Sequence, residues 1–172
     1  MNINSASAAL GMALLVTGLL IAVPRANAAT AVSTTDKDFI LAAAQGGMTE
    51  VKLGALAAQK GKRDDVKEFG RLMVKDHTAI DDNLKALAVQ KGVNLPDRLD
   101  AKHQAMVDKM AALTGSEFDN TYIASMIKDH KADAREFNAV SAETKDADIK
   151  SFVDKSIPVV ERHLKHITTM NS

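Results

Sequence analysis

The sequence has 172 residues, of which 46% are hydrophobic and 26% are charged, a composition typical of a globular domain rather than of a disordered chain. Its 22 basic and 22 acidic residues give a formal charge of zero, and the predicted loss of Arg25 with an export signal leaves a net charge of about −1, which argues against nucleic-acid binding. The chain has no Cys, which excludes disulfides, cysteine zinc sites, iron–sulfur clusters and thiol nucleophiles.

The first 28 residues are predicted to be an export signal. Residues 8–23 form an apolar run that is short for a membrane-spanning helix, and Ala26 and Ala28 supply the small-residue pattern read by signal peptidase. Residues 1–10 have no Lys or Arg, so the positive charge of the signal comes from the α-amino group or from a start upstream of Met1; an uncleaved N-terminal anchor is the alternative. We expect a signal peptide over residues 1–28, a short linker over 29–34 and one domain over 35–172, periplasmic or secreted, with no stable membrane span after cleavage.

Glycine, proline and capping residues divide the rest of the chain into five predicted helices. These cover residues 35–60, 64–91, 97–113, 116–143 and 146–170. Gly61 and Gly92 are expected to end the first two helices, and Ser116 to cap the fourth. Pro158 is expected to kink or break the fifth. No strand is predicted, so the fold class is all-α: a ferritin-like four-helix bundle with one extra short helix, which lets the chain cross between two helical hairpins.

Each long helix carries one polar, metal-capable residue on its apolar stripe. The stripe residues recur at alternating steps of three and four, which places them on the face toward the bundle interior. The polar members are Glu50, His77, His130 and His163. Folding each hairpin at its turn brings the two members of a pair to within roughly 5 Å in height, so one site in the middle of the bundle is possible. Gly47 and Gly54, one turn on either side of Glu50, predict a close backbone approach or room around the carboxylate.

These four residues are a candidate transition-metal site, because neutral imidazoles with one carboxylate suit iron, copper or zinc. Met73 and Met126 lie one turn before two of the histidines, and their thioethers would favour Cu(I); with Asp133 they are the secondary candidates. The alternative is a non-enzymatic stress or interaction protein of the cell envelope, whose histidines bond to Glu50 or Asp133 as a structural or pH-sensing network. The sequence predicts no catalytic residue and no nucleic-acid partner. The candidate partners are a second copy of the chain and another envelope protein.

A repeat connects the second and fourth helices. Phe69-x-x-x-Met73-Val74-Lys75-Asp76-His77 matches Tyr122-x-x-x-Met126-Ile127-Lys128-Asp129-His130 at an offset of 53 residues. Together with Pro158-x-x-Glu161-x-His163-Leu164, this repeat resembles the bacterial domain of unknown function 4142, over residues 36–170. The resemblance implies a secreted ferritin-like four-helix fold, often labelled an outer membrane protein, and no established activity. The matching positions are His77, His130 and His163, with Glu50 as the acidic residue of the first helix.

The sequence departs from the di-iron ferritins, which place Glu-x-x-His on two helices. Val74, Ile127 and Val160 stand three residues before the histidines, so the motif is absent and ferroxidase chemistry at a carboxylate-bridged pair is disfavoured. Asp76 and Asp129 are each adjacent to a histidine and point about 100° away around the helix. We expect them to orient a neighbouring side chain or to pair with Lys at the surface.

Overall fold

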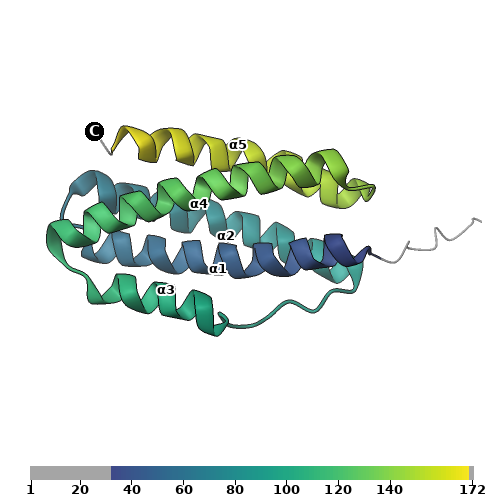
Figure 1. Cartoon of the computed structure of the whole chain (residues 1–172), viewed down its shortest axis with the longest axis horizontal. Coiled ribbons are helices and arrows are strands. Elements are labelled where there is room, and N and C mark those ends of the chain that lie inside the picture. The colour runs from purple at the N-terminus through teal and green to yellow at the C-terminus, as the bar shows by residue number, and fades with distance from the viewer. Residues whose placement is uncertain (1–31, 171–172) are drawn as a thin grey trace, which may run out of the picture.

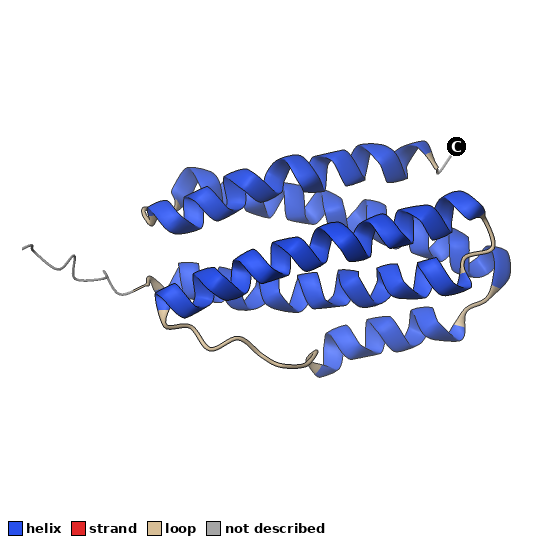
Figure 2. Cartoon of the chain, turned by 180° about the vertical axis from the view of Figure 1, so that it is seen from behind, coloured by secondary structure: helices blue, strands red, loops and turns tan. Residues whose placement is uncertain are grey.

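A computed structural model describes residues 32–170 as five helices (Figures 1 and 2). The helices are α1 (Thr34–Lys60), α2 (Asp64–Lys91), α3 (Ala101–Ala112), α4 (Gly115–Glu143) and α5 (Ala147–Thr169). The described residues contain no strand, so the predicted all-α class is confirmed. None of these helices has an apolar stretch long enough to cross a membrane. The predicted signal peptide, residues 1–28, lies outside the described residues, as does the first half of the predicted linker.

The four long helices form two hairpins that pack into a bundle. Helix α1 packs along α2, and α4 packs along α5, while the short α3 lies along the outer side of α1 (Figure 1). The loop between α2 and α3 runs back beside the bundle, so that α3 delivers the chain to the start of α4 at the other end (Figure 2). The short helix therefore makes the predicted crossing between the hairpins.

Local capping explains most helix ends. Ser33 begins α1 by accepting a hydrogen bond from the backbone N–H of Asp36, and Gly92 ends α2 in the left-handed conformation at φ 66°. Helix α3 begins at Ala101 and not at residue 97, because the Asp100 side chain accepts from the backbone N–H of His103 and so fixes the helix start there.

Two details of α4 and α5 differ from the prediction. Helix α4 begins at Gly115, and the Ser116 hydroxyl accepts from the Lys62 ammonium group instead of capping the helix. Helix α5 continues without a break through Pro158. Pro158 and Asp154 are both exposed, so water can reach the Asp154 carbonyl that loses its usual helical donor.

The bundle core is divided into two apolar clusters by a polar layer. One cluster contains Leu53, Phe69, Met73, Tyr122, Met126 and Ile167, and the other contains Phe39, Ile40, Leu84, Phe137, Phe152 and Val160. On every long helix the polar stripe residue stands between members of the two clusters. The predicted stripes therefore meet in one layer, which consists of Glu50, His77, His130 and His163, all buried.

Glycines allow α1 and α2 to approach closely beside this layer. A Cβ atom at Gly54 would lie 2.9 Å from the Gly70 carbonyl oxygen, and a Cβ atom at Gly70 would lie 2.6 Å from the Gly54 carbonyl oxygen. The predicted close approach at Gly54 is therefore confirmed. Gly47 makes room for a carboxylate, but it is that of Asp81, whose Oδ1 would overlap a Cβ atom at this position.

Candidate metal centre

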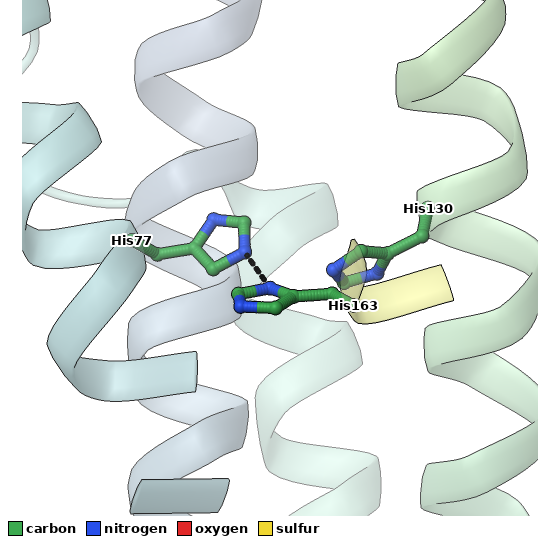
Figure 3. Close-up of side chains that lie close together, drawn as sticks. All are labelled: His77, His130 and His163. Atoms are coloured by element: carbon green, nitrogen blue, oxygen red, sulfur yellow. Dashed lines mark hydrogen bonds between the residues drawn. The ribbon is translucent and has the colours of Figure 1, made fainter. Parts of the chain in front are cut away.

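Three histidine rings from three helices converge inside the bundle (Figure 3). His77 comes from α2, His130 from α4 and His163 from α5, and each side chain is at most 2–3% exposed. Their ring centroids are separated by 5.3 to 5.6 Å. One ring nitrogen of each histidine lies within 4.8 Å of the others, which is close enough for one ion to contact all three after small movements.

His77 and His163 belong to a chain of polar contacts that crosses the bundle. The Nδ1 atom of His77 lies 2.9 Å from Oε2 of Glu50, and its Nε2 atom lies 3.3 Å from Nδ1 of His163. The Nε2 atom of His163 lies 2.9 Å from Oδ2 of Asp76. Each of these two rings is thus held by a carboxylate on its outer side and faces the other ring on its inner side.

His130 is held by the backbone of its own helix. Its Nδ1 atom lies 3.0 Å from the carbonyl oxygen of Met126. Because a carbonyl oxygen only accepts, Nδ1 carries the hydrogen, and a neutral ring then leaves a lone pair on Nε2. This Nε2 atom is buried and has no hydrogen-bond partner, a rare and costly arrangement for a polar atom.

The same reasoning extends to the other two rings. When the carboxylates of Glu50 and Asp76 accept hydrogen bonds, the inner nitrogens of His77 and His163 carry lone pairs that face each other at 3.3 Å. A proton on one of the two nitrogens makes this contact a hydrogen bond, whereas a bound cation would use both lone pairs. Histidines that bind metals donate their other N–H group to a carboxylate or a backbone carbonyl in the same way.

Burial sets the protonation of the layer. Burial is the largest effect on all three histidines: it lowers the pKa of His77 and His163 and lowers that of His130 to about 4. The neutral imidazole, which is the form that binds metals, is therefore favoured at pH 7. Burial also raises the pKa of Glu50 to about 7, and burial with the nearby charge of Glu50 raises that of Asp133.

Comparison with known proteins supports the family suggested by the repeat. The DUF4142 family, described as a domain of unknown function, matches residues 22–170. The chain belongs to this family. No curated protein matches it at a significant level.

Two solved structures share the fold of this DUF4142 protein. A DUF305 fragment from Deinococcus radiodurans is 9% identical with a TM-score of 0.72, over 83% of this chain and 98% of the other. CopM in the Cu(I)-bound form is 17% identical with a TM-score of 0.66, over 78% of this chain and 94% of the other. At these identities the matches establish a shared helical-bundle fold.

The other predicted site residues of the DUF4142 bundle lie around the triad. Glu50 stands on the outer side of His77 and forms a second group with His130 and Asp133, in which the ligand atoms lie within 4.8 Å of one another. Met73 and Met126 are fully buried one turn before their histidines. His77 pairs with Glu50, one of the two carboxylates predicted as partners in a structural network, whereas His130 donates to the backbone and lies 3.7 Å from Glu50.

The two aspartates of the repeat have different roles in the DUF4142 structure. Asp76 orients His163 across the helix interface, as expected for an orienting residue, whereas Asp129 accepts from the Ser125 hydroxyl on its own helix. Asp81 was not predicted to lie near the site. Its position four residues after His77, on the same helical face, is the signal that could have indicated it.

Proposed function

We propose that this protein binds one transition-metal ion between His77, His130 and His163. The observation that carries the proposal is the buried, unpartnered Nε2 atom of His130, which faces the inner nitrogens of the other two rings. A metal ion would use all three lone pairs at once. The outer hydrogen bonds of the rings, to Glu50, Met126 and Asp76, would then hold each ligand in the orientation that coordination requires.

Cu(I) fits this environment best. Three neutral imidazoles leave the charge of the ion uncompensated, and a monovalent ion is the easiest to bury. The carboxylate of Glu50 can offset one positive charge, while the charge of Asp76 is shared with Arg162 at 3.5 Å. Met73 and Met126 are buried one turn before His77 and His130, and thioether ligands favour Cu(I) over iron or zinc. CopM, which shares the fold, has been solved with Cu(I) bound, so this ion is the first to test.

The burial of the site indicates handling of the ion rather than chemistry on a substrate. All three ligands are almost completely inaccessible, so a substrate has no direct path to the metal. We propose copper sequestration or delivery in the periplasm or outside the cell, where it would contribute to metal handling or to defence against oxidative stress. The export signal predicted over residues 1–28 supports this location.

The test is metal analysis of the mature protein, exported by its native host and purified without a histidine tag. We expect close to one copper per chain, and competition with a chromophoric Cu(I) chelator should give a matching stoichiometry. The double variant His77→Ala, His130→Ala should lose the ion, while His103→Ala, which removes a histidine outside the triad on α3, should retain it. A wild-type protein that takes up no copper, zinc or iron after incubation with each would overturn the proposal.

A structural network is the second candidate, because the contacts from Glu50 through His77 and His163 to Asp76 link three helices. In that case the histidines would fix helix register, and the function would lie in binding a second copy or an envelope protein. Under this alternative, substitution of His163 lowers the unfolding free energy by the same amount with and without added copper. Under the metal proposal, added copper stabilises only the wild-type chain.

A further inference from the structure

A small cavity leads from the surface toward the triad. It has a volume of about 50 Å³ and lies where α1, α2 and α4 meet, with α5 at its base. Its polar lining consists of Glu50, His77, Asp81, Asp133 and Glu136. Among the described residues that line it there is no Lys or Arg. Since one water needs about 10–15 Å³ of such volume, the cavity has room for a few waters or for one partly hydrated ion.

The carboxylates of the cavity are graded by depth. Glu136 is exposed, Asp81 and Asp133 are half-buried, and Glu50 is buried against His77. The four acidic side chains thus form a series from solvent to Glu50, which pairs with the proposed ligand His77. A cation that moves inward along this lining would be close to a carboxyl oxygen at every depth, which lowers the cost of leaving water.

Two buried carboxyl oxygens of the residues that line this cavity have no hydrogen-bond partner. They are Oδ1 of Asp81 and Oε1 of Glu50; the latter lies 3.7 Å from Nδ1 of His130, and the Glu50 side chain is nine-tenths buried. The Asp81 carboxylate occupies space that exists only because residue 47 is Gly, since a Cβ atom there would overlap it. Burial raises the pKa of Asp81 to about 6, so the carboxylate is mostly ionised at neutral pH. An ionised, unpartnered oxygen in an acidic cavity points to a cation as its occasional partner.

A larger hollow beside the layer has a different lining. This groove of about 360 Å³ between α2 and α5 reaches Asp76 but none of the three histidines. Lys155 and Arg162 line it, and Arg162 lies 3.5 Å from Asp76. Asp76 and Asp148 balance these two positive charges, so the groove lacks the excess of acidic side chains that would attract a cation. The acidic cavity is therefore the better route to the triad.

We propose that the acidic cavity is the access passage for the metal ion, and that Asp81 is the half-buried carboxylate that captures the ion and passes it to the triad. This inference rests on the proposed function and adds to it the route by which a buried site is loaded. Asp81 acts on the rate of loading and is not a ligand of the bound ion. Its loss should therefore slow uptake without changing the final occupancy.

The test is a double-mixing experiment with Cu(I) supplied in dilute acetonitrile. Protein and Cu(I) are mixed, and bathocuproine disulfonate is added after a variable delay to trap all copper that has not reached the buried site. We expect Asp81→Asn to slow loading by roughly fivefold and to weaken its dependence on salt. Asp82→Asn is the matched control, because it removes the same charge from the neighbouring exposed residue, which pairs with Lys85.

A second variant tests the same passage without deleting the charge. Gly47→Ala pushes the Asp81 carboxylate out of its place and should also slow loading, with equal final occupancy. Loading rates of both variants within twofold of wild type would overturn the passage while leaving the metal site intact. Absence of bound copper in the wild-type protein would show instead that the proposed function itself is wrong, and it would refute the access passage as well.

Discussion

The buried carboxyl group of Glu50 makes the stability of the metal-free protein depend on pH. Burial is the largest effect on this group and raises its pKa from 4.5 to about 7. The folded state therefore holds this proton more tightly than the unfolded state, and the free energy of unfolding falls as the pH rises from about 4.5 to about 7. Replacing Glu50 with Gln leaves a neutral side chain of similar shape at every pH.

The expected size of the effect follows from the pKa change. A shift of one pKa unit corresponds to about 1.4 kcal/mol, so the rise at Glu50 amounts to about 3 kcal/mol. Glu50→Gln should therefore gain about 3 kcal/mol relative to wild type between pH 4 and pH 8. The pKa of Asp133 is raised partly by the charge of Glu50, so the loss of that charge acts in the same direction.

The assay is urea unfolding of chelator-treated protein at several pH values, followed by circular dichroism. The quantity to compare is the difference in unfolding free energy between variant and wild type, since most other titrating groups cancel from it. Glu136→Gln is the control, because it makes the same chemical change at an exposed position in the same cavity. If the difference for Glu50→Gln is as flat with pH as that of the control, Glu50 is not held in its neutral form by burial.

Three further outcomes are expected. Gly70→Ala should destabilise the protein by about 2 kcal/mol in thermal unfolding, because the new Cβ atom would lie 2.6 Å from α1 backbone atoms. Gly46→Ala is the control: the space around this residue is open, so the change should stabilise the protein by up to about 1 kcal/mol. Asp76→Ala should weaken Cu(I) binding by roughly 10- to 100-fold in chelator competition, because His163 loses the acceptor that orients it; an unchanged affinity would exclude this role. Cu(I) at 100 times its dissociation constant should raise the unfolding free energy by about 2.7 kcal/mol, and no rise would contradict specific binding to the folded state.

Features that depend on local sequence were predictable. Gly61 and Gly92 end their helices as expected, since a helix end is determined by the few residues around it. The histidine layer was also predictable, because a helical stripe has a fixed rise and each hairpin aligns two stripes at its turn. The residues of each pair were therefore expected within roughly 5 Å of each other in height, near enough for one site. The three histidine rings are 5.3 to 5.6 Å apart.

Features that depend on contacts between helices could not be predicted in the same way. The choice of Asp76 as the partner of His163, and of the Met126 carbonyl as the partner of His130, follows from side-chain directions that spacing does not determine. The place of Asp81 depends on the space above Gly47 of another helix. The predicted start of α3 at residue 97 was wrong. The Asp100 side chain caps the helix, and this choice over earlier capping candidates depends on the position of the preceding loop.

The two repeats differ in how their aspartates support the three histidines of the proposed site. Both repeats place Asp before His, but only Asp76 reaches across to another helix, where it holds His163. Asp129 instead accepts from the Ser125 hydroxyl, and His130 donates its Nδ1–H to the Met126 carbonyl of its own helix, which leaves Nε2 without a hydrogen-bond partner. Helix α1 contributes Glu50, whose negative charge a buried cation needs, in place of a fourth imidazole. A bundle selected only for stability would gain more from apolar side chains in this layer, which lies between two apolar clusters, so the retained polar atoms favour a ligand.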